Sequence, residues 1–393
     1  MPMLTVVSRS WPPQVQGSPI LLSNLFSDYP GELRAIAGYT KDSPTEASFT
    51  PPCPTHYLRL PRVLAPVYDG LFRRRPGLMC RGIQGSILNA VRRSKAQAVF
   101  GVFPYEDYLV ASYRAARKLR LPFYAHMHDL WQENRVPGTR RGDFAAKWEP
   151  FVLKGATRVL CMTEAMQEHY ERKYKIRTEL LPHCIRARDL TSAPKGMRAP
   201  KMEKPTVLFV GSVSKPMNED ALRVLARSSE LLPPDYDLLF CTASNEAALA
   251  EIGIRSSRLQ ARYVTRSEVQ RLQSEAHVLV APLSFKDGSA DEVRTVFSTK
   301  LLEYLVSGRP IVVFAPGDSH HARSARDRGW GYVVDEDSPE ALAAGIRKVA
   351  TDEALAASLV EGALREARSR DSSIHAARLN NWVMEDAAVT VAV

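Results

Sequence analysis

The chain lacks long hydrophobic runs. None of its apolar stretches approaches the ~20 residues that a membrane-spanning helix needs. The first stretch, Leu4–Val7, is short and is followed by Trp11-Pro12-Pro13 rather than by a cleavage site. We therefore expect neither a signal peptide nor a transmembrane segment, and we interpret the N-terminus as a first β-strand with its turn.

Cysteine pairs and metal-ligand clusters are also missing. The five cysteines are scattered, odd in number and without C-x-x-C spacing, which argues against a disulfide framework and against a zinc site. The adjacent His320 and His321 would point apart and chelate poorly. We expect a cytoplasmic protein without a bound metal, because a reducing compartment suits unpaired cysteines best.

Two nucleotide-binding patterns are absent as well. No G-x-G-x-x-G follows a strand candidate, which argues against a nicotinamide-dependent dehydrogenase. No D-x-D pattern falls in a plausible metal-binding loop. We therefore expect no cofactor.

Positive charge, in contrast, is plentiful and unevenly placed. The 393 residues carry a net charge of +10, and the window 62–95 holds eight basic residues and one acid. A second basic group comprises Arg114, Arg117, Lys118 and Arg120. Such a surface could face anionic lipid, nucleic acid or a phosphorylated acceptor, or could simply be solvated. No nucleic-acid-binding module accompanies it.

The chain alternates short β-branched runs with amphipathic stretches. We expect strands in the first half at Leu4–Val7, Glu32–Ala37, Ala98–Val102, Phe123–His126, Arg158–Met162 and Thr178–Leu181. Helices are expected at Asp107–Leu119, Phe144–Lys154 and Glu164–Lys173. In the second half we expect strands at Thr206–Val210, Leu238–Cys241, Val278–Ala281, Ile311–Phe314 and Tyr332–Val334. The helices there are Asn218–Ser229, Ser267–Ser274, Ser298–Val306, Pro339–Ala350 and a closing helix from Ser372 to Asp386. Two such runs predict two parallel sheets, each covered by helices on both faces.

A Pro/Lys-rich segment separates the two runs. Residues 193–205 read APKGMRAPKMEKP, a composition typical of a linker. We predict a first domain at 1–192, this linker, a second domain at 206–370 and a C-terminal helical segment at 371–393 that packs back on the first domain.

Two strand-to-helix turns in the second half suggest phosphate binding. In TVLFVGSVSK a strand ends at Gly211, whose missing side chain permits close backbone approach, and Ser212 and Lys215 follow in the loop. In VRTVFSTKLLEYLVSGRPIVVF, Ser298 and Thr299 stand where a helix should begin, so their amides and hydroxyls can hold a diphosphate.

The second of these turns carries two further charged residues. Lys300 lies in the first helical turn, where a cation is unfavourable unless an anion lies beside it. A carboxylate at Glu303 can accept hydrogen bonds from two ribose hydroxyls.

The stretch STKLLEYLVSGRPIVV resembles the donor-binding helix of GT-B glycosyltransferases, especially glycosyltransferase family 4. The resemblance implies two Rossmann-like doubly wound parallel-sheet domains facing a cleft. It assigns the nucleotide ribose to Glu303. The family's first acid, which contacts the donor sugar, falls on Thr295 here, and an Arg of the family's phosphate loop falls on Ser212, which leaves Lys215 as the candidate there.

The resemblance extends to the first domain. SRSWPPQVQGSPILLSNLF is similar to the family's first strand and loop, which places Gly17 and Ser18 over the cleft. LPFYAHMHDLW is similar to a strand ending in a His-Asp pair, so His128 and Asp129 are the implied catalytic residues. The segment 40–93 has no counterpart, and in GT-B enzymes this region shapes the acceptor site.

The family implies transfer of a sugar from a nucleotide sugar, with UDP-sugar expected, to an acceptor hydroxyl. It also implies retention of anomeric configuration without a metal. We expect a glycan, a lipid-linked glycan or a polysaccharide precursor as acceptor, and a peripheral place on the cytoplasmic face of an anionic membrane if the basic surface docks there. Two alternatives remain at this point: a non-catalytic homologue that acts as a partner subunit, favoured by Thr295 and Ser212, and a sugar-nucleotide epimerase.

Overall fold

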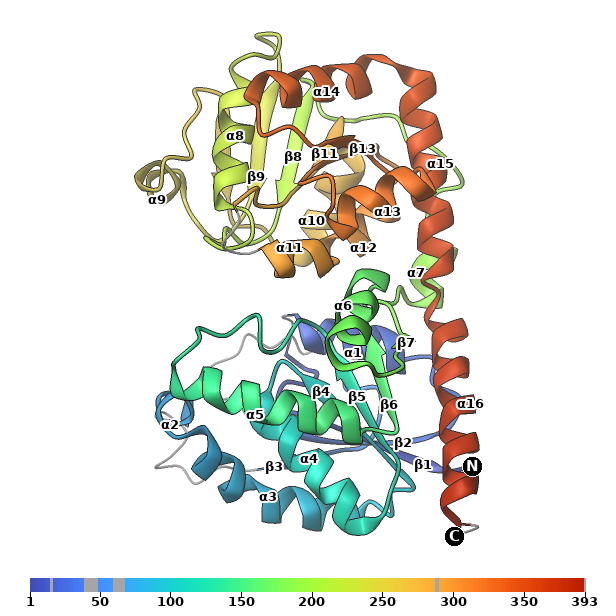
Figure 1. Cartoon of the computed structure of the whole chain (residues 1–393). Coiled ribbons are helices and arrows are strands. Elements are labelled where there is room, and N and C mark those ends of the chain that lie inside the picture. Colours follow the sequence, from blue (N-terminus) through green and yellow to red (C-terminus); the bar gives the residue numbers. More distant parts are fainter. Residues whose placement is uncertain (15–16, 39–48, 59–67, 287–289, 392–393) are drawn as a thin grey trace. The chain divides into compact units, whose positions relative to one another are not determined.

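The computed structural model describes residues 1–393 except 15–16, 39–48, 59–67, 287–289 and 392–393. The chain forms two compact units (Figure 1). Unit 1 comprises Met1–Ala187 together with Asp371–Val393, and unit 2 comprises Arg188–Arg370. Each unit is built around a parallel β-sheet of its own.

The sheet of unit 1 has the strand order β3-β2-β1-β4-β5-β6-β7, all parallel. Its strands are β1 (Met3–Ser8), β2 (Glu32–Gly38), β3 (Thr55–Leu58), β4 (Ala98–Phe103), β5 (Phe123–Met127), β6 (Arg158–Cys161) and β7 (Glu179–Leu180). The helices are α1 (Ser18–Phe26), α2 (Tyr68–Arg74), α3 (Pro76–Arg93), α4 (Glu106–Leu119), α5 (Arg140–Gly155), α6 (Glu164–Tyr174) and α16 (Ser372–Val391). A short helix, α7 (Ala187–Thr191), begins at the last residue of the first segment of unit 1 and continues into unit 2. The central strands β4 and β5 are buried along their whole length, as expected for a sheet covered on both faces.

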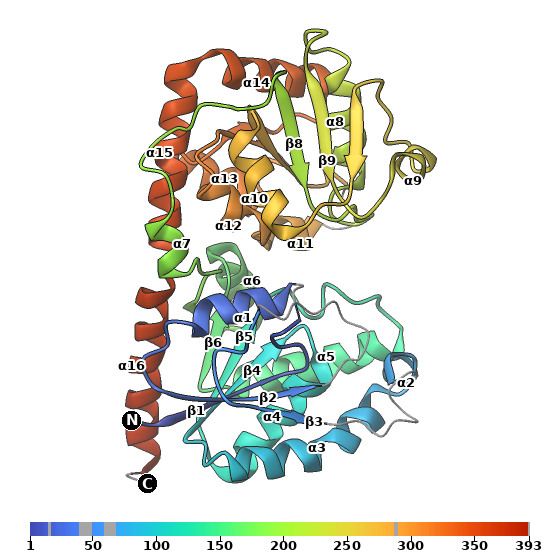
Figure 2. The same ribbon diagram turned by 180° about the vertical axis from the view of Figure 1, so that it is seen from behind.

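Different helices cover the two faces of this sheet. Figures 1 and 2 show α3, α4 and α5 on one face and α1 on the other. The C-terminal helix α16 packs beside α1 and contributes Leu379 and Val383 to the buried cluster of that face. It is fixed at both ends, because the Ser372 amide donates to the Ile185 carbonyl at 2.9 Å and Arg158 Nε donates to Asp386 at 2.8 Å.

The sheet of unit 2 has the strand order β10-β9-β8-β11-β12-β13, again all parallel. Its strands are β8 (Thr206–Val210), β9 (Asp237–Cys241), β10 (Leu259–Arg262), β11 (Val278–Pro282), β12 (Ile311–Phe314) and β13 (Tyr332–Val334). The helices are α8 (Glu219–Ser229), α9 (Glu246–Glu251), α10 (Arg266–Glu275), α11 (Ala290–Thr295), α12 (Lys300–Leu305), α13 (His320–Arg328), α14 (Pro339–Thr351) and α15 (Glu353–Ser369). α8 and α10 lie on opposite faces of the sheet (Figures 1 and 2).

The two sheets confirm the predicted α/β class with parallel strands covered by helices. In each sheet the strand order reverses beside the first strand, between β1 and β4 in unit 1 and between β8 and β11 in unit 2. Ligands of open parallel sheets bind outside the carboxyl ends of the strands at such a switch point. The candidate site residues are therefore sought at these two edges.

The proline-rich segment 193–205 contains no helix or strand. The backbone of unit 2 holds it, because the Arg198 amide donates to the Gly308 carbonyl at 2.9 Å and the Lys201 amide donates to the Glu275 carbonyl at 3.1 Å. The boundary between the two units lies upstream, between Ala187 and Arg188.

Candidate functional site: the carboxyl edges of the two sheets

In unit 2 the loop after β8 is held in one shape by an asparagine. Gly211 has φ 136°, a conformation that side chains rarely adopt. The Asn218 side chain accepts from the Ser214 amide at 2.9 Å and donates to the Ser212 carbonyl at 3.1 Å. The side chains of Ser212 and Lys215, both predicted to bind the donor, are exposed on this loop.

Lys300 reaches this loop from the start of α12. A Cβ on Gly211 would lie 3.0 Å from Lys300 Nζ, so the ammonium lies directly beside the glycine. The ammonium also lies 4.3 Å from the centre of the Phe209 ring. Burial in this apolar surrounding lowers the pKa of Lys300 to about 7. Among the described residues no carboxylate forms an ion pair with it, so the site holds a cation without its counter-charge.

α12 is anchored at the switch point by Tyr304. Its buried hydroxyl accepts from the Val210 amide at 3.0 Å and donates to the Val280 carbonyl at 3.4 Å, which ties the helix to the end of β8 and the middle of β11. Glu303, the predicted ribose ligand, is half-buried next to this anchor and accepts a bond of 3.3 Å from the buried Gln273 of α10. The structure thus brings Gly211, Lys300 and Glu303 to one edge.

The backbone before α12 differs from the prediction. The helix begins at Lys300 rather than at Ser298, and Thr299 is its N-cap without a side-chain cap. The Ser298 amide donates to His321 Nε2 at 3.0 Å, so this amide is not directed at a ligand. The buried Thr295 hydroxyl donates to the Asp291 carbonyl of its own helix at 2.8 Å, which turns it away from a donor sugar.

His321 is a residue whose role the sequence did not reveal. It is buried at the start of α13, and since Nε2 accepts from Ser298, its proton is on Nδ1. Burial, followed by the charges of His320, Lys300 and Arg370, holds the pKa of His321 well below its usual value. A neutral imidazole is what the hydrogen bond to Ser298 requires. The sequence pattern indicated only that His320 and His321 would not chelate a metal.

Tyr263 was also not predicted. It follows β10 directly and is 80% exposed at the same carboxyl edge that carries Gly211. β10 is the outer strand of this sheet and is separated from β8 by β9, so Tyr263 lies at the carboxyl edge but to one side of the switch point. An aromatic ring exposed there offers a face on which a flat ligand can stack. The sequence feature that could have identified Tyr263 is an aromatic residue directly after a polar strand.

In unit 1 the structure brings together Ser18 and His128, which were predicted separately, Ser18 for the cleft loop and His128 as a catalytic residue. Gly17 is the N-cap of α1 with φ 48°, and a Cβ there would contact no other atom. Ser18 Oγ lies 2.9 Å from His128 Nδ1, and His128 Nε2 lies 3.1 Å from His126 Nδ1. Both ring nitrogens of His128 are thus occupied by the protein, and burial lowers its pKa to about 3. At neutral pH the ring is uncharged.

Asp129 follows at the end of β5 and is half-buried. Burial raises the pKa of its carboxyl to about 6, against the opposing charge of Arg135. The loop that carries it is held firmly, because the Trp131 amide donates to the Tyr170 hydroxyl at 3.1 Å and the Gln132 amide donates to Glu149 at 2.7 Å. Asp129 therefore has a fixed backbone and a carboxyl that titrates near neutrality.

No three potential metal ligands come together in the part of the chain that the structure describes. All five cysteines are unpaired. None of the described helices combines the length and the hydropathy needed to cross a bilayer.

Each of the two units matches a glycosyltransferase family model. Residues 204–352 match the family model "Glycosyl transferases group 1", and residues 31–182 match the "Glycosyl transferase 4-like domain". Together the two matches span most of the chain, which belongs to this glycosyltransferase family. No curated protein matches the sequence.

Solved structures with the same fold cover nearly the whole chain. Sucrose-phosphate synthase from Thermosynechococcus elongatus is 16% identical with a TM-score of 0.69 over 98% of each chain. Anabaena HepE in complex with UDP is 14% identical with a TM-score of 0.68 over 98% of this chain and 100% of its own. An α,α-trehalose-phosphate synthase from Burkholderia vietnamiensis is 12% identical with a TM-score of 0.67 over 98% and 100%.

Proposed function

We propose that this glycosyltransferase moves a sugar from a nucleotide sugar to an acceptor hydroxyl. The observation that carries the proposal is the half-buried Lys300 ammonium, which lies beside Gly211 at the switch point of unit 2 without an acidic partner among the described residues. A cation desolvated in this way is stabilised by a bound anion. The donor diphosphate supplies that anion.

The rest of the donor is arranged around this contact. The diphosphate lies against Lys300 and the loop of Gly211, Ser212 and Lys215, with the free amides of Thr299 and Lys300 at the start of α12. Glu303 accepts the ribose hydroxyls, and the exposed ring of Tyr263 stacks on the base. UDP is the favoured nucleotide, since the Anabaena relative was solved with UDP and with UDP-glucose.

The reaction needs little general acid–base catalysis from the protein. A nucleoside diphosphate is a good leaving group, so the protein has to hold it, stabilise its developing charge and align the acceptor. We propose retention of configuration without a metal, with the leaving phosphate accepting the acceptor's proton. The neutral His128, whose ring nitrogens contact Ser18 and His126, holds the end of β5 in place, and Asp129 next to it binds a sugar hydroxyl.

The acceptor is proposed to be a glycan, a lipid-linked glycan or a polysaccharide precursor. The test is an assay of nucleoside diphosphate release from a panel of nucleotide sugars, with soluble sugars and a lipid extract as acceptors. We expect one nucleotide sugar to be used, the anomeric configuration to be retained in the product, and Lys300→Met to raise KM for that donor. An inverted product would overturn the retaining step, and undiminished release by Lys300→Met would overturn the donor site.

A further inference from the structure

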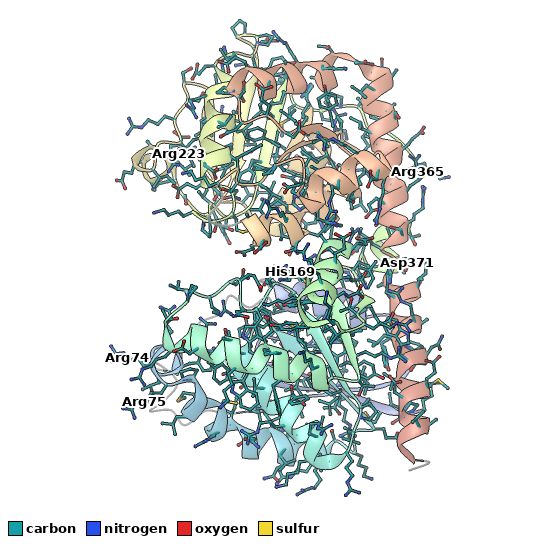
Figure 3. The ribbon with its side chains drawn as sticks, viewed as in Figure 1. Arg74, Arg75, His169, Arg223, Arg365 and Asp371 are labelled. Atoms are coloured by element: carbon teal, nitrogen blue, oxygen red, sulfur yellow. The ribbon has the colours of Figure 1, made fainter. Side chains whose placement is uncertain are left out.

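The surface formed by α2 and α3 of unit 1 carries a cluster of exposed positive charges. Every described basic side chain of this surface is exposed: Arg73, Arg74, Arg75, Arg81, Arg92, Arg93 and the following Lys95. None of them forms an ion pair with a carboxylate among the described side chains. In Figure 3, Arg74 and Arg75 project away from the ribbon where α2 meets α3.

Three of these charges are unfavourable for the N-terminus of α3, although Arg73 and Arg74 also lie in the last turn of α2, where a cation is favourable, as Arg92 and Arg93 are in the last turn of α3. Arg73, Arg74 and Arg75 precede its first residue, and Arg75 is the N-cap without a side-chain cap. The first turn of α3 holds no acid. Cations at a helix N-terminus are unfavourable because they face the positive end of the helix dipole. An external anion at this end would reverse the effect.

Three glycines on the exposed side of α3 are a second feature that the packing of the protein does not explain. Gly77, Gly82 and Gly85 are exposed, none has a positive φ, and a Cβ at each would meet no other atom. Glycine in a helix is less stable than alanine. Since neither packing nor backbone geometry requires them, they leave this side of α3 flat for an approaching surface.

An exposed apolar side chain lies among these charges. Leu78, in the first turn of α3, is 59% exposed. A nucleic-acid backbone gains nothing from a leucine, whereas the headgroup region of a bilayer accepts both arginines and an apolar side chain.

We propose that α2 and α3 form a docking surface for an anionic phospholipid membrane. Arg74, Arg75 and Arg81 contact lipid phosphates, and Leu78 enters the boundary between headgroups and acyl chains. Most of this surface lies in the segment 40–93, which was expected to have no family counterpart but falls within the match to the glycosyl transferase 4-like domain at residues 31–182. Membrane docking is independent of the donor site, because binding needs no nucleotide, and it would bring the protein to a lipid-linked acceptor.

The test is co-sedimentation with vesicles of phosphatidylcholine alone or with about one third phosphatidylglycerol, a fraction that gives a negative surface potential. We expect binding to the anionic vesicles only and loss of binding near 1 M salt, where the Debye length is ~3 Å. The double variant Arg75→Glu/Arg81→Glu should bind at least about 30-fold more weakly, since each basic residue at an anionic surface contributes about fivefold. The new glutamates lie near the N-terminus of α3, where negative charge interacts favourably with the helix dipole, so α3 should remain folded.

The matched control is Arg365→Glu/Arg368→Glu, with the same charge change on the exposed side of α15 in unit 2; Arg365 is labelled in Figure 3. This variant should bind like wild type, and Leu78→Ser should bind about tenfold more weakly. Three outcomes would overturn the proposal: equal binding of wild type to neutral and anionic vesicles, equal losses in the two double variants, or RNA binding as tight as vesicle binding together with an unaffected Leu78→Ser variant.

Discussion

Nucleotide binding should take up a proton at Lys300. Burial lowers the pKa of this lysine to about 7 in the free protein. At pH 8 only about one molecule in eleven carries the charge, and a diphosphate beside the ammonium raises its pKa again. Binding of UDP at pH 8 should therefore take up about 0.9 proton. Titration calorimetry in buffers of different ionisation enthalpy measures this number directly.

The affinity should follow the same linkage. Above pH 7 and up to the pKa of the complex, Kd for UDP should rise about tenfold per pH unit, because the protein must be protonated before it binds. The terminal phosphate of UDP ionises near pH 6, so the range from about 7.5 to 9 isolates the lysine. Lys300→Arg keeps a permanent charge and should show neither proton uptake nor this slope. A wild-type Kd that stays flat over this range, or equal proton uptake by Lys300→Arg, would refute the reasoning.

Substitutions at three other residues test single contacts. His321→Ala leaves the Ser298 amide without its acceptor and should lower the free energy of unfolding by about 1–3 kcal/mol in denaturant melts. Because the pKa of His321 is depressed in the folded protein, wild type should lose stability as pH falls below about 6.5, and His321→Asn should lose less; equal pH profiles would contradict this. His128→Ala should reduce turnover by less than ~10⁴-fold, and a larger loss would exceed a positioning role. Tyr263→Ala should weaken UDP binding by about 1–3 kcal/mol, whereas Tyr263→Phe should bind normally; equal losses would exclude base stacking.

The buried strands were predictable because their sequence leaves few alternatives. β8 and β12 are continuous apolar runs bounded by turn residues, and both were placed correctly. The edge strands β3 and β10 escaped prediction, because THYL and LQAR are short and largely polar and are recognised only through their neighbours in the sheet. α3 escaped because its glycines oppose helix propensity, although its buried residues recur at helical spacing.

Local motifs identified individual site residues but not their contacts. Gly211 and Lys300 were expected to bind phosphate separately, and the structure adds that the lysine ammonium lies directly beside the glycine. Ser298 was expected to offer its amide to a ligand, but His321, 23 residues further on, accepts that bond. This contact depends on where β12 and α13 place His321. A local sequence pattern carries no information about that position.

The most direct test of the donor site is a thermal-shift panel of UDP, GDP, ADP, TDP and CMP on wild type and Glu303→Ala. At ligand ~100-fold above Kd, binding adds about 2.7 kcal/mol, which raises Tm by a few degrees. We expect one nucleotide, UDP by preference, to stabilise wild type and to have little effect on Glu303→Ala. Stabilisation by none of the five, or equal stabilisation of both proteins, would contradict a nucleotide-sugar site at Lys300 and Glu303.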